Sequence, residues 1–347
     1  MKKQNNVENG INDWNSIVNL IKNVIKTQTF LLLTALLILF LVFSIFEESF
    51  FTRRSITSML FQLPEFGILS LAMMIPMMIG GDDLSIVSTA NLSAILSGFF
   101  SVKVLPNILP EEYSIIYIGS IFLLSMIVGC ITGLFNGILV GYIGANSILV
   151  TLSTLTFFTG ISIGLTKGSV LIGLPESIGL IGSESILGIP ISFLIFVVVS
   201  MVVFIILNHT PLGFKIRMMG TNQSASKFSG INNKKIIIKI FIISGILSSI
   251  SGILIMSRTL SASYQYGAST YILLTILIGV LAGVVSGKGS VLNVFVSVLI
   301  LQVISTGFHM MLVGIRGSSF FKDFIWGILL IVIFIINHYR EKMKKLS

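Results

Sequence analysis

Long apolar runs separated by short polar segments occupy most of this chain. The first run, Thr29–Phe46, is about 18 residues long, enough for a helix to cross a hydrocarbon core of roughly 30 Å. Nine later runs follow, at 56–79, 86–102, 114–140, 147–165, 190–207, 236–256, 270–285, 291–312 and 320–337. Because a lipid-exposed backbone must satisfy its own hydrogen bonds, the pattern predicts an all-α polytopic membrane protein with about ten transmembrane helices.

Polar segments divide the chain into three parts. Residues 1–28 form a polar N-terminal segment, residues 29–337 a transmembrane domain, and residues 338–347 a basic tail. An even number of spans places both ends on the same side of the membrane. Cytoplasmic loops are enriched in Lys and Arg, and both the tail and the loop 209–235 are basic. We therefore expect both termini and this loop to be cytoplasmic.

The loop 209–235 also carries the signals of two short helices. Pro211 suits the first turn of a helix that Gly220 can end. Asn222 can cap a second helix that runs through Ser229 and stops at Gly230. A loop that builds its own helices suggests a binding partner, although a solvated linker beside the membrane is the alternative.

Composition excludes a water-soluble globule. Hydrophobic residues make up 54% of the chain, charged residues make up 10%, and the mean hydropathy is +1.02. The net charge of +9 needs no nucleic-acid partner, because most Lys and Arg fall in segments assigned to the cytoplasmic side. The single cysteine, Cys130, excludes an intramolecular disulfide and is expected to be a small packing residue.

Two Gly-rich segments interrupt the apolar sequence. Pro64 and Pro76 are expected to break the second span, which Gly80–Leu84 separates from the third. The segment Ala282–Ser290 is a similar break in the other half of the chain. Transporters use such discontinuities to expose backbone groups and helix ends to a cavity.

Asp82 and Asp83 are the clearest polar candidates within apolar sequence. A carboxylate at the centre of a bilayer costs about 2.5–3.5 kcal/mol on insertion scales, so it is usually functional or shielded. Capping of the helix that begins near Ser85 is the favoured interpretation, with a place in a translocation pathway as the alternative. Proton coupling is disfavoured because the other spans offer only Glu65 and His309 as relay partners.

Small and amide residues mark other helices. A glycine recurs at every fourth position of the fourth span, at Gly129, Gly133, Gly137 and Gly141. This spacing lets membrane helices approach closely, so we expect it to be a packing face. Asn136, Asn91 and Gln302 could each hydrogen-bond a hydroxylated solute or, equally, a neighbouring helix.

The chain lacks the sequence signatures of an enzyme or a nucleotide-binding protein. Gly287–Ser290 resembles the end of a phosphate-binding loop, but Ala282 stands where the first glycine is required and Gly289 follows Lys288 in place of Ser or Thr. No metal-ligand cluster and no set of nucleophile, base and acid stands out, so no cofactor is expected. If ATP is used, a different chain must bind it.

Several separated motifs together resemble the ribose-type permease subunits of bacterial ABC importers, relatives of the branched-chain amino-acid permeases. Gly80, Gly81, Asp83, Leu84 and Ser85 resemble the Gly-Gly-x-Asp-Leu-Ser motif of that family. TLSTLTFFTG at 151–160, the loop at 210–235 and the Gly-rich region GVLAGVVSGKGSVLNVFVSVLIL are similar to three further family segments. The resemblance covers the chain from about residue 50 to its end. Asp82 and Ala282 depart from the family pattern.

This resemblance implies the permease fold of ABC importers and a transport subunit without covalent chemistry. It implies that the chain lies in a bacterial plasma membrane and has three protein partners: an ATP-binding cassette subunit, an extracytoplasmic solute-binding protein, and a second permease copy or paralogue. The residues implied in coupling to the ATPase subunit are Gly220, Asn222, Ala225, Ser226, Lys227, Ser229 and Gly230. Those assigned to the translocation pathway are Asp82, Asp83, Ser85, Asn91, Asn136 and Gln302.

A monosaccharide is the expected substrate, with a nucleoside or a sugar-like signalling molecule as alternatives. Two rival functions have discriminating features. An ion-coupled secondary transporter would need intramembrane charge pairs and relays, which are sparse in this sequence. A membrane enzyme acting on lipid-linked substrates would need a cluster of catalytic polar residues at the membrane surface, which the sequence does not suggest.

Overall fold

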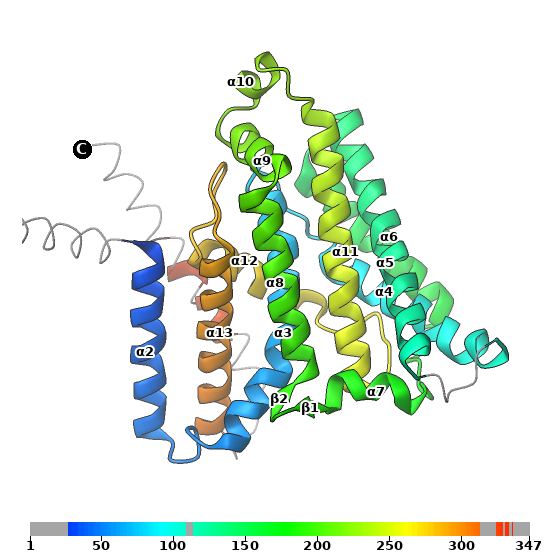
Figure 1. Ribbon diagram of the computed structural model, residues 1–347, viewed down its shortest axis with the longest axis vertical. Coiled ribbons are helices and arrows are strands. Elements are labelled where there is room, and N and C mark those ends of the chain that lie inside the picture. The colour runs from blue at the N-terminus through cyan, green and yellow to red at the C-terminus, as the bar shows by residue number, and fades with distance from the viewer. Residues whose placement is uncertain (1–26, 109–113, 313–323, 329, 333–334, 336–347) are drawn as a thin grey trace, which may run out of the picture.

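The chain folds into a bundle of helices (Figure 1). The computed structural model describes residues 27–108, 114–312, 324–328, 330–332 and 335. The N-terminal segment before Thr27 and the basic tail lie outside these described residues. The expectations about the two termini therefore concern parts of the chain that the structure does not describe.

Eight helices in the described part of the chain are long and apolar enough to cross a membrane. They are α2 (Gln28–Phe46), α3 (Arg53–Met77), α4 (Ile86–Lys103), α5 (Ser114–Ile138), α6 (Ser147–Thr166), α8 (Ile191–His209), α11 (Asn233–Thr259) and α13 (Val291–Met311). Each matches one of the apolar runs, which confirms the all-α polytopic fold. The expected tenth span, 320–337, lies mostly outside the described residues.

The span expected at 270–285 is wrong in its length. The corresponding helix, α12 (Ala268–Leu281), has 14 residues and is therefore about 21 Å long, too short to cross a core of roughly 30 Å. Gly267 precedes it with φ +65° and Gly283 follows it with φ +71°. Two glycines in left-handed conformations bound the helix, which apolar composition alone could not reveal.

Pro64 does not interrupt the second span, which ends one residue after Pro76. Helix α3 continues through Pro64 and ends at Met77, next to Pro76. Beyond it, the N–H groups of Ile79 and Gly81 both donate to the Pro76 carbonyl, at 3.0 and 3.1 Å. A proline inside a membrane helix is tolerated where neighbouring groups satisfy the freed backbone, so only the second proline marks the break.

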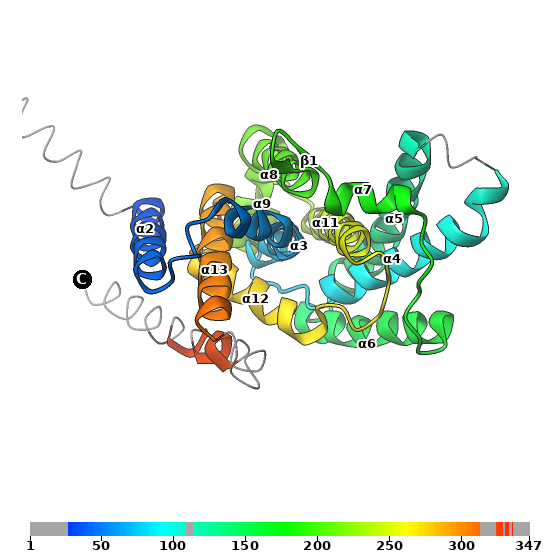
Figure 2. The ribbon, with the colours of Figure 1, turned by 90° about the horizontal axis from the view of Figure 1, so that it is seen from below.

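Helix α3 lies at the centre of the bundle, and α2 lies at its edge (Figures 1 and 2). In α3, 78% of the apolar window is buried, against 11% in α2. The exposed side chains of α2 include Leu37, Ile38 and Ile45. An apolar helix with so little burial is suited to contact with lipid.

The glycine strip of α5 packs against α11, as its spacing predicts. A methyl group added at Gly129 would overlap the Gly245 carbonyl oxygen, and one added at Gly133 would overlap the Phe241 carbonyl oxygen. Gly137 and Gly141 face the backbone of the same helix. The two helices therefore meet backbone to backbone.

Short elements cover the two ends of the bundle (Figure 1). One end, here called the α9 end, carries α9 (Pro211–Thr221) and α10 (Gln223–Phe228). The opposite end, the α7 end, carries α7 (Glu176–Ser183) and the hairpin of β1 (Ser185–Ile186) and β2 (Ile189–Pro190). Two single turns complete the order, η1 (Leu105–Asn107) after α4 and the π-helical η2 (Leu139–Ile143) after α5.

Candidate functional site

Both chain breaks meet α9 at one place. The first break, residues 78–85, joins α3 to α4, and the second break, residues 282–290, joins α12 to α13. The N–H of Gly287 donates to the Met78 carbonyl at 2.8 Å. The two Gly-rich segments that the sequence places in different halves of the chain are therefore in direct contact.

Gly220 brings α9 into this contact. A methyl group at Gly220 would overlap both the Met78 carbonyl oxygen and the Gly287 nitrogen. The expectation that Gly220 ends its helix is wrong, because α9 continues to Thr221 and Gly220 is not among the residues with positive φ. Glycine is required here for close approach to backbone atoms rather than for a turn.

Helix α10 begins and ends as its sequence predicts. The Asn222 side chain accepts a hydrogen bond from the Ala225 N–H at 2.9 Å, and Gly230 follows the helix with φ +80°. Ser226 is buried, and its hydroxyl bonds to the Gln223 carbonyl and to the Asn233 side chain, each at 2.9 Å. Ser226 therefore holds α10 against the start of α11.

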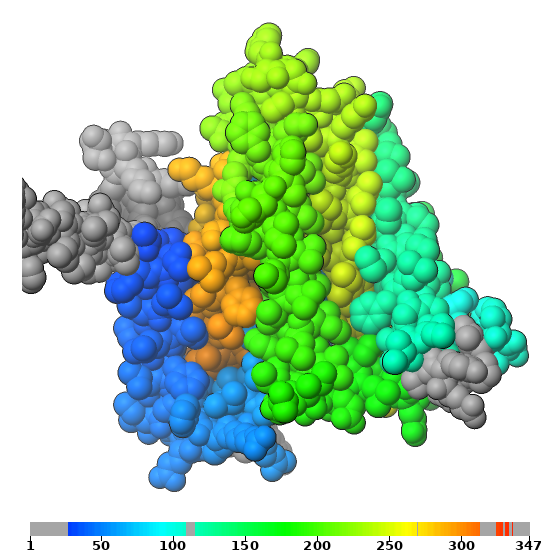
Figure 3. All heavy atoms as spheres, viewed as in Figure 1, coloured from blue at the N-terminus to red at the C-terminus, as the bar shows by residue number. Residues whose placement is uncertain are grey.

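The outer surface of α10 is exposed and partly apolar. Ala225, Lys227, Ser229 and Gly230 are all exposed. Phe228 is 93% exposed, and α10 forms the outermost surface of the α9 end in Figure 3. Phe228 was not predicted as a site residue, although an aromatic residue in a short polar helix is a signal that could have been used.

A buried polar network surrounds Asp83. Its carboxylate accepts hydrogen bonds from the Ser85 N–H at 3.1 Å, the Ser85 hydroxyl at 2.6 Å and the Ser244 hydroxyl at 2.8 Å. The Asn136 amide donates to the Ser85 hydroxyl at 2.8 Å. The network joins the first break to α5 and α11, and it brings together three of the six pathway candidates.

Capping by the aspartates takes a different form from the one expected. Helix α4 begins at Ile86, and its N-cap residue is Ser85, whose own side chain makes no capping bond. Asp83 accepts the N–H of Ser85 rather than one from the first turn of α4. Asp82 is half-buried, and its carbonyl accepts the Thr151 hydroxyl of α6 at 3.2 Å.

The other two pathway candidates lie apart from this network. Asn91 is buried on α4 and donates to the carbonyls of Tyr264 and Tyr266, each at 3.0 Å. Gln302 is buried on α13 and donates to the Thr306 hydroxyl at 3.1 Å. Both side chains make hydrogen bonds within the protein, but not to a neighbouring helix as the packing alternative expects: Asn91 bonds to the loop between α11 and α12, and Gln302 bonds within its own helix.

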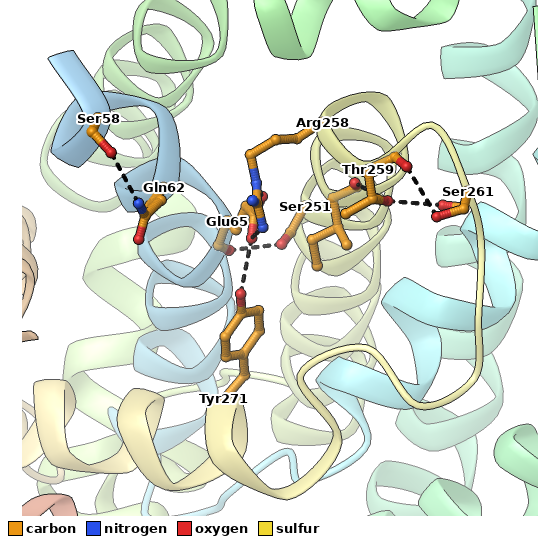
Figure 4. A network of polar contacts seen from close by, with 9 residues as sticks. Ser58, Gln62, Glu65, Ser251, Arg258, Thr259, Ser261 and Tyr271 are labelled. Atoms are coloured by element: carbon orange, nitrogen blue, oxygen red, sulfur yellow. Dashed lines mark hydrogen bonds and ion pairs between the residues drawn. The ribbon is translucent and has the colours of Figure 1, made fainter. Parts of the chain in front are cut away.

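A second polar network joins α3, α11 and α12 (Figure 4). Arg258 of α11 forms an ion pair with Glu65 of α3, and its second contact, from Nη2 to Glu65 Oε2, is 3.1 Å. The Tyr271 hydroxyl of α12 donates to the same carboxylate at 2.9 Å. The Ser251 hydroxyl donates to the Glu65 carbonyl at 2.7 Å. One buried carboxylate therefore ties three helices together.

A cavity of about 690 Å³ opens beside this ion pair. Its lining residues come from the first turns of α3 and from the last turn of α11: Arg53, Arg54, Thr57, Ser58, Phe61, Gln62 and Arg258. A second cavity of about 400 Å³ is lined by α5, η2 and α6 and is mainly apolar. None of the six pathway candidates lines either of these two cavities.

Sequence reasoning undervalued Glu65 and missed Arg258. The sequence interpretation considered Glu65 only as a possible proton-relay partner, and Arg258 falls just beyond the apolar run 236–256. A carboxylate in the middle of an apolar span is itself a signal to look for a cationic partner. Spacing along the chain could not identify that partner, because 193 positions separate the two residues.

The membrane-crossing helices define a polytopic membrane protein with two paired breaks and an exposed α9–α10 unit. Residues 55–334 match the family described as "Branched-chain amino acid transport system / permease component", and the chain belongs to that family. The relatives it matches are transport permease subunits rather than enzymes.

Named relatives match along most of their length. The ribose import permease protein of Haemophilus influenzae is 29% identical, over 88% of this chain and 91% of that protein. The autoinducer 2 import system permease protein of Yersinia enterocolitica is 26% identical, over 81% of this chain and 84% of that protein. The D-allose transport system permease protein of Escherichia coli is 25% identical, over 82% of this chain and 84% of that protein. No solved structure gave a significant match.

Proposed function

We propose that this chain is the membrane-spanning permease subunit of an ATP-driven importer and that it moves a small hydroxylated solute, with a monosaccharide as the expected substrate. Family membership supports the transport role. The relatives named for ribose and D-allose support the substrate class. The relative named for autoinducer 2 favours a sugar-like signalling molecule as the second candidate.

The contact of α9 with both breaks is the observation that carries the coupling proposal. ATP is bound and hydrolysed by a separate subunit, which docks on the α9 end through α10. The residues proposed for coupling are Gly220, Asn222, Ala225, Ser226, Lys227, Ser229 and Gly230, together with the exposed Phe228. The buried Ser226 contributes by holding α10 in place rather than by touching the partner. Gly220 belongs to this set because it connects α9 to the two breaks, so a movement of α9 would displace both.

Motion of α9 would reach the pathway through backbone contacts. Gly220 touches Met78 and Gly287, and the first break continues from Met78 to Asp83. Nucleotide-dependent movement of the ATPase subunit would therefore shift both breaks together. Such coupling requires different contacts in the outward-open and inward-open states.

The six pathway candidates remain proposals of unequal support. Asp83, Ser85 and Asn136 share one network at the first break. The Asn136 amide oxygen is buried without a hydrogen-bond partner among the described residues, which leaves an acceptor free for another conformation. Asp82, Asn91 and Gln302 are included for their polarity alone.

Location and assembly complete the proposal. The chain is a multi-pass membrane protein. We place it in a bacterial plasma membrane with both termini and the α9 end in the cytoplasm, because the loop 209–235 is basic. A solute-binding protein would deliver substrate at the α7 end, and a second permease copy or paralogue would complete the pathway.

Affinity purification from the native membrane in mild detergent tests this proposal. We expect an ATP-binding subunit to co-purify, and to be lost when residues 222–230 are scrambled. Leu187→Ser is the matched control, because Leu187 is 97% exposed at the α7 end. Solute uptake by this chain alone, driven by an ion gradient, would instead identify a secondary transporter.

A further inference from the structure

Three of the seven residues that line the cavity at the α7 end are arginines. Arg53 and Arg54 lie at the start of α3, and Arg258 lies at the end of α11. Within the described residues, the pair of Arg258 with Glu65 is the one ion pair within 4 Å, so Arg53 and Arg54 have no carboxylate partner there. Among the described residues, the cavity therefore carries two arginines that no carboxylate within 4 Å compensates.

These arginines oppose the usual distribution of charge. Basic residues are enriched on the cytoplasmic side of membrane proteins, and the α7 end is the side proposed to face outward. The carboxylates of Glu47, Glu48 and Glu184 do not pair with them. Two arginines beside one cavity, with no carboxylate partner among the described residues, are better explained by a ligand than by orientation.

Polar side chains continue the lining toward the ion pair. Arg54, Ser58 and Gln62 are four residues apart on α3, so they share one face of the helix. Gln62 donates to the Ser58 hydroxyl at 3.2 Å, and Figure 4 shows this pair on α3, followed along the helix by Glu65. This face offers hydrogen-bonding groups of the kind that hydroxyls require.

We propose that this cavity binds a hydroxylated solute that carries a carboxylate or phosphate group, such as a sugar acid or a sugar phosphate. The inference rests on the proposed transport function and narrows its substrate class. Arg53 and Arg54 would bind the anionic group, because the planar guanidinium matches carboxylate and phosphate geometry. Gln62 and Ser58 would bind hydroxyls. The cavity volume of about 690 Å³ lies within the range of small-molecule sites.

Arg258 has a positioning role in this site. Its side chain is 36% exposed and faces the cavity, while Glu65 is 2% exposed and holds it by an ion pair. Tyr271 in turn fixes the Glu65 carboxylate. The pair keeps one guanidinium at the inner wall without adding net charge to the cavity.

Ligand binding to the purified full chain, with its co-purifying subunits in lipid nanodiscs, tests the inference. The compounds are D-glucuronate, glucose 6-phosphate and neutral glucose, and the readout is the thermal unfolding midpoint at low ionic strength. We expect an anionic compound to raise the midpoint more than glucose does. The double variant Arg53→Gln/Arg54→Gln should weaken that binding at least about 10-fold.

The double variant Lys103→Gln/Lys167→Gln is the control, because both lysines lie outside the cavity lining. It should bind the anionic compounds as the unchanged chain does. Equal effects of glucose and the anions, or full binding by the arginine variant, would overturn the inference while leaving the transport proposal intact. Reduced uptake that depends on the solute-binding protein, with anion binding unchanged, would also overturn it and assign the arginines to docking.

Discussion

At the α9 end, three segments meet through backbone atoms, whereas at the α7 end three helices meet through charged and aromatic side chains. Gly220, Met78 and Gly287 make the first junction. Glu65 and Arg258, with Tyr271, make the second. The backbone junction is tightly packed, because even a methyl group at Gly220 would overlap its neighbours. A side-chain junction can separate and re-form without distorting either helix.

This difference suggests separate mechanical roles for the two ends. We expect the α9 end to move as one unit with both breaks when a partner pulls on α10. We expect the helices to part at the α7 end, where rotation of Arg258 would break its ion pair with Glu65 and leave the Ser251 hydroxyl as a remaining polar contact between α3 and α11. Single substitutions at each end can separate these roles.

Gly220→Ala should be the most damaging change. Its methyl group would overlap a backbone oxygen that cannot move independently, so we expect a loss of about 3 kcal/mol or more. The measurement is the thermal unfolding midpoint and the monodisperse yield in detergent. Gly160→Ala is the control, because nothing lies within 4 Å of its added methyl group, and it should change stability by no more than about 1 kcal/mol. Similar results for the two variants would refute a rigid backbone junction.

Arg258→Met should destabilise the protein by about 2–3 kcal/mol, because it leaves the Glu65 carboxylate buried without its cation. Glu65→Gln should cost less, since the partly exposed Arg258 can be hydrated. Unfolding midpoints of both variants give the order. Arg54→Met is the control within the same cavity and should have little effect on stability. The reverse order for Arg258 and Glu65 would contradict the side-chain junction.

Asp83→Ala should cost about 1–2 kcal/mol, because it leaves the buried Ser85 and Ser244 hydroxyls without their acceptor. The neighbouring Asp82→Ala change should be milder, since Asp82 is only half-buried. Unfolding midpoints and solute uptake of the two variants show whether Asp83 contributes more to stability and transport than Asp82 does. Equal loss of stability in both would show that the network around Asp83 is not what distinguishes them.

Phe228→Ser should leave stability within about 0.5 kcal/mol, because the ring is 93% exposed. It should nevertheless reduce recovery of the ATP-binding subunit in affinity purification. Leu187→Ser, at the opposite end, should leave that recovery unchanged. If Phe228→Ser co-purifies the subunit as well as the unchanged chain does, α10 is not the docking surface.

Much of the fold could be predicted from the pattern of apolar residues. Eight spans, the capped α10 and the packing face on α5 follow from length, helix signals and glycine spacing, all of which are local properties. The length of α12 could not be predicted, because flanking glycines rather than hydropathy set its ends. The predicted break at Pro64 was also wrong, because a membrane helix can continue through a proline.

The candidate site was predictable only in part. Asp83 and Ser85 were identified from the first break, but their link to Asn136 and Ser244 depends on helices far apart in the sequence. The role of Gly220 was misassigned, because a glycine near a helix end has the same local signature whether it turns the chain or admits another backbone. Arg258 was missed for a related reason, since its partner lies on a different helix.

The membrane-embedded class, most helices and the basic loop were already present in the order of residues, because hydrophobic length and charge bias act locally along the chain. Three features emerged only on folding: the two breaks meet α9, Glu65 pairs with Arg258, and three arginines surround one cavity. Those contacts join residues that are distant in sequence, and they form only when the helices pack.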